Sequence, residues 1–253
     1  MGNKLVELRN VTKSFGKVRA VDNVSMYVGE NEIIGLIGDN GAGKSTLIKI
    51  LSGVHAPDSG EIYVRGEKVV RWSVARAQQA RIETVHQDRA LVVQQSIARN
   101  IFMGRERTSF LGIINVKEQY AEAERLMREI GFTSKVFTPD SVVSTLSGGE
   151  RQGVAIARAM YFDADLIILD EPTTALSLTE SEKVFSFMRA AKEKSHSTIF
   201  ISHNIYHAYD IADRFVIIDR GRVVVDAEKA RFPSAQALVE EMQLIARTGH
   251  QSA

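Results

Sequence analysis

The sequence contains no cysteine, which excludes disulfide bonds, thiol nucleophiles and cysteine-ligated zinc. Neither sign of charge is in excess, because 32 basic and 31 acidic residues give a formal net charge of +1. With no basic block, the composition does not favour nucleic acid as a partner. Long apolar runs are missing as well. Leu166–Leu169 is typical of those present and is far shorter than the roughly 20 residues of a membrane-spanning helix.

The first residues have no apolar stretch of the kind that forms a signal peptide. If the protein works at a membrane, we therefore expect a partner to hold it there. A length of 253 residues with 44% hydrophobic composition suits one large α/β domain, or a core with a small subdomain.

A glycine-rich segment between two apolar stretches carries the clearest functional pattern. Residues 38–46 read Gly-Asp-Asn-Gly-Ala-Gly-Lys-Ser-Thr and match the phosphate-binding loop G-x-x-x-x-G-K-[ST]. The apolar run 32–37 predicts a buried strand before it, and residues 47–52 predict a short helix after it. An ordinary glycine-rich turn is the alternative, but these flanks favour the phosphate loop. The candidate binding residues are Gly38, Asn40, Gly41, Gly43, Lys44, Ser45 and Thr46.

Within this loop, backbone N–H groups and the helix N-terminus would face phosphate oxygens. Lys44 would reach the β- and γ-phosphates, and the Ser45 hydroxyl would bind Mg²⁺. The predicted cofactors are therefore ATP and Mg²⁺.

Two adjacent acids follow a second apolar run, at residues 170 and 171. An apolar strand that ends in acids is common, so the pattern gains weight from the phosphate loop upstream. We assign Asp170 to the Mg²⁺ shell through water and Glu171 to activation of the attacking water.

A second candidate anion site lies at Leu146-Ser147-Gly148-Gly149-Glu150, directly before the helical stretch 151–161. Ser147, Gly148 and Gly149 would offer a hydroxyl, free N–H groups and a helix dipole. A serine-capped helix with a flexible entry is the alternative. One domain does not need two phosphate sites, so we expect this one to serve the ATP that another copy holds.

His203 follows the predicted strand 198–201 closely, at the edge where parallel α/β sheets bind ligands. There an imidazole can donate to a γ-phosphate. A lone histidine is more often a plain surface or core residue, but its position in this set of motifs favours the functional role.

The remaining pattern predicts interleaved strands and helices. Residues 5–28 and 61–70 predict hairpins, and 82–85, 166–169, 198–201 and 215–218 predict buried strands. Asn115 with Glu118 predicts a helix start before the apolar positions Tyr120, Ala123, Met127 and Ile130, which we expect to face the core. Thr179 with Glu182 predicts a capping box for the helix through Val184, Phe185 and Met188. A last amphipathic helix is predicted near 234–247.

In this order of motifs the chain resembles the ATP-binding subunits of ABC transporters, over nearly its whole length. The resemblance implies an α/β fold: a P-loop NTPase (RecA-like) core with a largely parallel sheet, an antiparallel β-subdomain at the N-terminus and an inserted helical subdomain. The expected core comprises residues 1–88 and 143–228, the helical subdomain 89–142, and a helical tail 229–253.

The resemblance also implies further roles. Phe15 matches the aromatic residue that stacks on adenine, although hairpin packing alone would explain it. Gln87 matches the residue that links Mg²⁺ and the attacking water to the membrane subunits. Residues 175–177 match the loop that crosses the dimer, but Ser177 stands where that family usually has aspartate. This departure weakens the case for a carboxylate contact across the dimer.

Three segments, 38–45, 96–106 and 171–177, resemble the monosaccharide-import branch (ribose, xylose and fructose types). The resemblance then implies two ATP-binding subunits packed head to tail around two ATP molecules. They are expected to be two identical chains, with a paired relative as the alternative partner. It further implies a permease contacted through Gln87 and the surface near 89–106, and an extracytoplasmic solute-binding protein as an indirect partner. The expected location is the cytoplasmic face of the membrane, as a peripheral subunit. A plain solvated loop and helix is the alternative for 89–106.

Other functions remain open from the sequence alone. The same ATP sandwich operates in DNA repair and translation, although residues 89–142 are too short for a coiled coil and lack heptads. A nucleotide-gated interaction module would not need Glu171 or His203. An exporter or an amino-acid importer is a third alternative.

Overall fold

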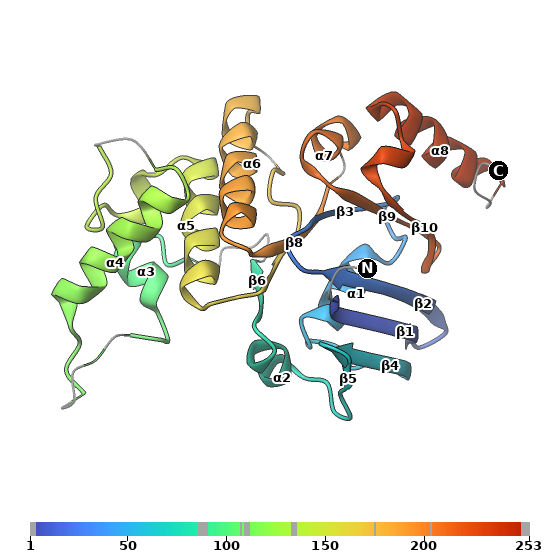
Figure 1. The fold of residues 1–253 in the computed structure, drawn as a ribbon, viewed down its shortest axis with the longest axis horizontal. Helices are drawn as coiled ribbons and strands as arrows, with labels where there is room; N and C mark the ends of the chain where they lie inside the picture. Colours follow the sequence, from blue (N-terminus) through green and yellow to red (C-terminus); the bar gives the residue numbers. More distant parts are fainter. Residues whose placement is uncertain are drawn as a thin grey trace.

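The computed structural model describes residues 4–85, 91–106, 108, 112–132, 136–174, 176–202 and 204–248. Two sheets organise this part of the chain (Figure 1). The six-stranded sheet has the order β10-β9-β3-β8-β7-β6, and the four-stranded sheet has the order β2-β1-β4-β5. This confirms the expected combination of a largely parallel core and an antiparallel N-terminal sheet.

The six-stranded sheet is parallel through β6 (Ile82–Val85), β7 (Leu166–Leu169), β8 (Ser197–Ile201), β3 (Ile33–Ile37) and β9 (Arg214–Asp219). Only β10 (Arg222–Glu228) runs antiparallel, paired with β9. Parallel strands place their carboxyl ends on one edge. The segments after β3 and β7 therefore leave the sheet together, which brings the phosphate loop and the acidic pair to the same edge.

The central strands bury both faces, and alternate residues enter different cores. Ile34 and Leu36 belong to the core beneath the four-stranded sheet and α1 (Lys44–Leu51), whereas Ile33 and Ile37 belong to the core beneath the helices. Because successive side chains of a strand point to opposite faces, a strand covered on both sides is apolar at every position. This explains the short uninterrupted apolar runs of the sequence.

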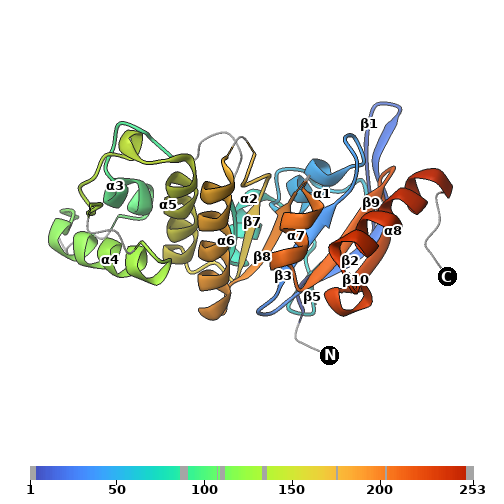
Figure 2. The same ribbon diagram turned by 90° about the horizontal axis from the view of Figure 1, so that it is seen from above.

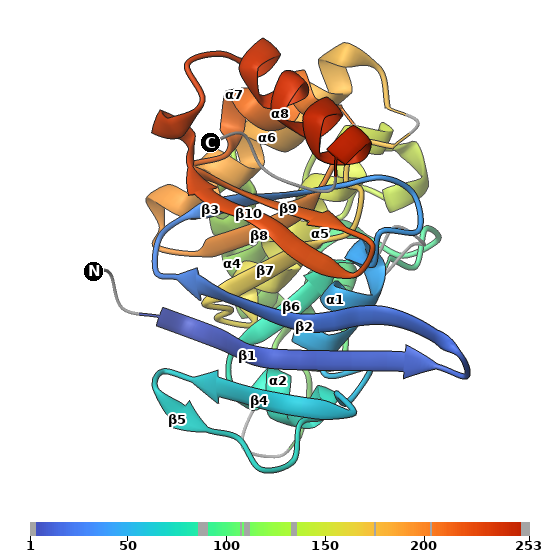
Figure 3. The same ribbon diagram turned by 90° about the vertical axis from the view of Figure 1, so that its right-hand side faces the viewer.

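The N-terminal sheet lies across one face of this core (Figure 3). It consists of β1 (Lys4–Phe15), β2 (Val18–Gly29), β4 (Ser59–Val64) and β5 (Glu67–Lys68), all antiparallel. Both predicted hairpins are confirmed, and α2 (Val74–Gln79) leads from the second one to β6.

Helices cover the other face and extend to one end of the molecule (Figure 2). They are α5 (Gly148–Tyr161), α6 (Leu178–Glu193), α7 (Ile205–Ile211) and α8 (Ala235–Thr248), with α3 (Ile97–Phe102) and α4 (Val116–Glu129) packed beyond α5. Short 3₁₀ turns occur at Val143–Thr145 and Lys229–Arg231. Within the described ranges, no helix is both long enough and apolar enough to span a bilayer.

Local helix signals are confirmed at α4 but not at α6. Asn115 caps α4 by accepting from the Glu118 N–H, and Ala123, Met127 and Ile130 are buried. The predicted Thr179–Glu182 capping box of α6 is wrong. The helix begins two residues earlier, with Ser177 as its N-cap and Glu180 as the third helical residue. Both pairs have the required spacing, so the sequence pattern alone did not decide between them.

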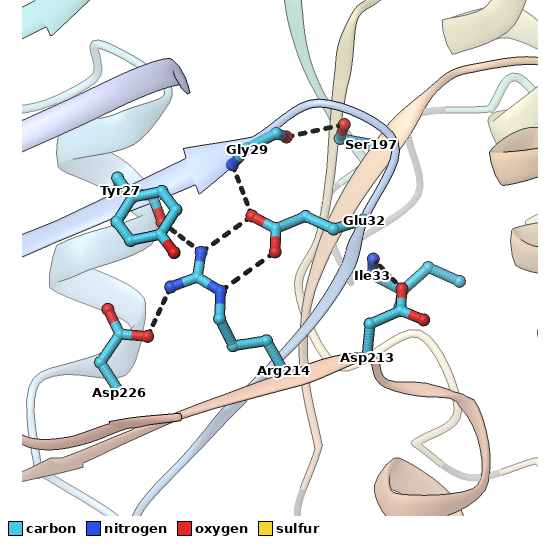
Figure 4. Close-up of polar contacts among 8 residues, drawn as sticks. All are labelled: Tyr27, Gly29, Glu32, Ile33, Ser197, Asp213, Arg214 and Asp226. Carbon is cyan, nitrogen blue, oxygen red and sulfur yellow. Dashed lines mark hydrogen bonds and ion pairs between the residues drawn. The ribbon is translucent and has the colours of Figure 1, made fainter. Parts of the chain in front are cut away.

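An ion cluster around the buried Arg214 joins the two sheets (Figure 4). The Arg214 side chain, at the start of β9, is 4% exposed. Its guanidinium donates to both carboxylate oxygens of Glu32, at 3.0 and 2.8 Å, and to the Tyr27 carbonyl at 2.6 Å, and it also pairs with Asp226. The cluster therefore ties β2 and the turn before β3 to β9 and β10, and supports the sheet from behind the site.

Two further hydrogen bonds extend this cluster. The Asp213 carboxylate accepts from the Ile33 N–H at 2.7 Å, and the Ser197 hydroxyl donates to the Gly29 carbonyl at 3.0 Å (Figure 4). The starts of β3, β8 and β9 are thus anchored by polar side chains.

Candidate nucleotide-binding site

The phosphate-loop sequence forms the connection between β3 and α1. Gly43 takes the N-cap position of α1 in a left-handed conformation, with φ of 109°, which favours glycine. The Lys44 side chain is buried, and its Nζ donates to the carbonyls of Gly38 and Asp39, at 2.7 and 2.8 Å. The lysine thus closes the loop on itself and holds its amine at the centre of the turn.

A cavity of about 340 Å³ opens beside this loop. Its walls come from the loop, from β2, from the end of β7 and from the β9–β10 turn. The lining residues are Val18, Arg19, Ala20, Asn40, Gly41, Gly43, Lys44, Ser45, Thr46, Glu171, Arg220 and Gly221. The structure therefore brings the loop and Glu171 into one cavity, although about 125 residues separate them in the chain.

Glu171 reaches this cavity through an unusual backbone. The residue has φ of 51°, the left-handed region that non-glycine residues rarely occupy. Its Oε2 accepts from the Thr174 hydroxyl at 2.9 Å, and the preceding Asp170 N–H donates to the Val85 carbonyl at 3.2 Å. The turn after β7 is thus fixed at both acids, and the strained position directs Glu171 toward the loop.

The electrostatics of the cavity depend on Lys44. Burial lowers the pKa of Lys44 below its ordinary value, and the negative charges of Glu171, Asp39 and Asp170 oppose that shift. A buried ammonium near carboxylates suits a triphosphate, because the ligand adds negative charge to a site where the lysine is poorly solvated.

The oxygen donors beside Lys44 fit magnesium. Ser45 is exposed toward the cavity that Glu171 also lines, and Asp170 precedes Glu171 at the strand end. A hydroxyl and a carboxylate oxygen, completed by phosphate oxygens and water, form the kind of incomplete protein shell in which Mg²⁺ is usually held.

The second predicted anion site forms the start of α5. Ser147 caps the helix: its Oγ accepts from the Glu150 N–H at 3.3 Å, and its N–H donates to Glu150 Oε2 at 2.9 Å. The Gly148 N–H donates to Glu180 of α6 at 2.9 Å. Among the described lining residues of the loop cavity, none comes from Ser147, Gly148 or Gly149. Within one chain, the two anion sites are therefore separate.

Phe15 lies at the end of β1 and is 46% exposed. Its ring meets the His55 ring edge-on, with centroids 5.2 Å apart. The Lys13 ammonium lies over the ring, 5.8 Å from its centroid. Phe15 does not line the described cavity. Gln87 and His203 fall outside the described residues. In sequence they follow β6 and β8, the two strands that flank β7.

Several cavity residues were missed from the sequence. Arg220 and Gly221 form the turn between β9 and β10, with φ of 44° and 80°. The Gly221 N–H donates to the Ala42 carbonyl at 2.8 Å, and the Gly221 carbonyl accepts from the Asp22 N–H at 2.7 Å. This turn thus connects β2 to the phosphate loop. An Arg-Gly pair between two β-branched runs is a hairpin signal, but nothing local indicates what the hairpin touches.

Comparison with known proteins finds similar sequences and similar structures. The family model described as ABC transporter matches residues 21–174. The xylose/arabinose import ATP-binding protein XylG of Sulfolobus acidocaldarius is 44% identical over 227 residues, covering 89% of this chain and 88% of that protein. The ribose import ATP-binding protein RbsA of Caldanaerobacter subterraneus is 35% identical over 224 residues, covering 88% of this chain but 45% of its own length.

The L-arabinose transport ATP-binding protein AraG of Geobacillus stearothermophilus is 39% identical over 226 residues, covering 88% of this chain and 43% of its own length. The chain thus spans less than half of these two relatives. Among solved structures, an ATP-binding cassette in its ADP conformation has a TM-score of 0.78 at 20% identity, with 95% of both chains covered. A dimeric cassette in a post-hydrolysis state with ADP and Pi has a TM-score of 0.72 at 26% identity, covering 88% of this chain and 98% of that one.

Proposed function

The chain belongs to the ABC transporter family and is an ATPase of that family, and we propose that it powers the import of a monosaccharide through a membrane permease. The observation that carries the ATP-dependent part of this proposal is the shared cavity of Lys44, Ser45 and Glu171, with the Ser147 turn outside it. Relatives named for xylose, arabinose and ribose import support the sugar class.

In this proposal, two copies pack head to tail with two ATP molecules between them. The phosphate loop of one copy binds the β- and γ-phosphates through Lys44 and its backbone N–H groups. The other copy binds the same γ-phosphate from the opposite side through Ser147, Gly148 and Gly149. Because ATP contacts both copies only when they are together, its binding favours the closed dimer. The dimeric cassette structure with ADP and Pi supports dimerisation.

Hydrolysis would then proceed by in-line attack of water on the γ-phosphate. Glu171 orients the water, and Lys44 takes up the charge that develops on the phosphate oxygens. Mg²⁺, when bound, supplies charge neutralisation at the phosphates; Ser45, Asp170 and Gln87 are the residues proposed to hold it. His203 is proposed to donate to the γ-phosphate. Phe15 is proposed to stack on the adenine ring.

The permease contact is proposed to involve the segment near 89–106. A cavity of about 360 Å³ between α3 and α4 is lined by Val92, Ala98 and Phe102 of that segment, together with Gln119. Gln119 is buried, and its Nε2 has no hydrogen-bond partner among the described residues. Polar residues, among them Gln95, Arg99 and Glu106, line the same cavity. A cavity of mixed polarity that contains an unsatisfied polar group supports docking of another chain there.

This proposal makes the subunit a peripheral protein of the cytoplasmic face, with an extracytoplasmic solute-binding protein as an indirect partner. It also divides the chain into a core of residues 1–88 and 143–228, a helical subdomain of 89–142 and a tail of 229–253.

One experiment tests the proposed function. The chain is reconstituted with its permease in vesicles, and phosphate release is measured with the solute-binding protein loaded with different solutes. Stimulation by a monosaccharide supports the proposal, and stimulation only by an amino acid contradicts it.

A further inference from the structure

Helices α5 and α6 lie side by side (Figures 1 and 2), and both begin with a serine cap and a glutamate three residues later. Ser147 Oγ accepts from the Glu150 N–H, and Ser177 Oγ accepts from the Glu180 N–H, both at 3.3 Å. In turn, each glutamate carboxylate accepts from the backbone N–H of its own serine, at 2.9 Å for Glu150 and 3.1 Å for Glu180. Both helices therefore begin with a complete capping box.

Each of these glutamates also bonds to the other helix. Glu150 Oε1 accepts from Lys183 Nζ of α6 at 2.9 Å, and Glu180 Oε1 accepts from the Gly148 N–H of α5 at 2.9 Å. The two helix caps are thus joined by hydrogen bonds. As a result, the N–H of Gly148 is already bound to a carboxylate within the single chain.

The glycine pair allows this close approach. A Cβ atom on Gly148 would lie 2.4 Å from Leu176 Cδ2, and one on Gly149 would lie 2.7 Å from the Glu180 carbonyl oxygen. The segment that opens α6 therefore rests directly on the glycines that open α5. Any larger residue at Gly149 would push Glu180 away from these N–H groups.

Glu180 is a charged occupant of this position. Hydrogen bonds from the Ser177 backbone and hydroxyl, and then from the backbone of Gly148 and Gly149, hold the pKa of Glu180 below its ordinary value. The group is therefore an anion at neutral pH. A phosphate oxygen bound at this helix N-terminus would accept from the same N–H groups. Two anions that share these donors would repel each other.

We propose that Glu180 is a positioning residue: its carboxylate is the resident anion of the α5 N-terminus and yields the Gly148 N–H group to the γ-phosphate that the partner subunit presents. This inference rests on the proposed function. In the free chain Glu180 keeps this donor satisfied and oriented. In the closed dimer the phosphate replaces it, so the repulsion of Glu180 sets how much ATP is needed for closure.

The test uses the Glu171→Gln chain, in which hydrolysis is blocked, and measures dimer formation by light scattering against ATP concentration. Adding Glu180→Gln keeps the side-chain shape but removes the charge. It should lower the ATP concentration for half-maximal dimerisation by about 3- to 10-fold, the equivalent of one hydrogen bond. Binding of a fluorescent ATP analogue to the monomer, which uses the loop at Lys44, should not change.

Two matched variants in the same background separate release from other effects. Glu182→Gln removes an exposed charge from the same helix and should leave the ATP requirement unchanged. Lys183→Met loosens the same pair of helices by removing the bond to Glu150, but it leaves Glu180 in place and should not lower the requirement.

An unchanged or raised ATP requirement in Glu180→Gln overturns the inference, as does an equal decrease in Lys183→Met. Failure of the proposed function gives a different result. In that case the Glu171→Gln parent does not dimerise with ATP at any concentration, and the release step falls with it.

Discussion

Replacing Gly43 with alanine places a methyl group against the backbone of β2. The added Cβ would lie 2.3 Å from the Ala20 carbonyl oxygen, in a residue with φ of 109°. Gly41 is the matched control, because it also has positive φ, at 80°, but a Cβ there has no described atom within 4 Å. Both variants lose about 1–2 kcal/mol of unfolding free energy to the left-handed backbone. Only Gly43→Ala also forces the loop away from β2.

The contact with β2 sets the difference between the two variants. Overpacking against atoms that cannot rotate away costs a further ~1–3 kcal/mol, so Gly43→Ala should lose about 2–5 kcal/mol in total. For a chain of this size that extra loss lowers Tm by about 2–12 °C relative to Gly41→Ala. Denaturant unfolding of both variants measures the difference. Equal losses would refute the view that the phosphate loop is braced by β2.

Four further changes test the site and its support. Glu171→Gln should keep ATP binding but reduce phosphate release by ~10²–10⁴-fold; retained turnover would assign water activation to another group. Lys44→Ala should weaken nucleotide binding itself, and an unchanged titration with a fluorescent ATP analogue would contradict the assignment. Because burial lowers the pKa of Lys44 from its ordinary value, its charge is lost at a lower pH than that of an exposed lysine, so ATP affinity should already fall as pH rises toward the ordinary lysine pKa of about 10.4; a calorimetric profile that stays flat up to that pH would argue against it. Arg214→Leu removes the cation that pairs with the partly exposed carboxylates of Glu32 and Asp226 and should cost about 1–3 kcal/mol of unfolding free energy; a variant as stable as the parent in denaturant would show that the ion cluster is dispensable.

The phosphate loop and the buried strands could be predicted from the sequence because their determinants are local. The loop needs fixed residue types at fixed spacing, and a strand covered on both faces needs an apolar residue at every position. The capped start of α4 at Asn115 is local for the same reason. These elements therefore agree with the structure.

The start of α6 shows where local reasoning ends. Ser177 with Glu180 and Thr179 with Glu182 both satisfy the capping-box spacing. The structure uses the first pair, in which Glu180 also accepts from the Gly148 N–H of α5. That second bond joins residues 32 positions apart. A local sequence pattern around α6 does not include Gly148, so it cannot predict this contact.

The residues that line the nucleotide cavity could not all be predicted, for the same reason. Ala20 and Gly221 reach the loop only because β2 and the β9–β10 turn pack against it. The cluster at Arg214 depends likewise on strands that are distant in sequence. Such contacts follow from sheet order and register, which local periodicity does not specify.

A mixing experiment tests most directly whether ATP is held between two chains. Lys44→Ala removes the loop half of the site, and Ser147→Asp retains a good helix cap but places a negative charge against the γ-phosphate. Each variant alone should hydrolyse ATP poorly, because both of its sites are damaged. A mixed dimer has one site with both defects and one intact site, so an equal mixture should recover up to about a quarter of the normal rate by random pairing. A mixture as inactive as its two components would contradict the account, as would full activity of the Ser147→Asp chain alone.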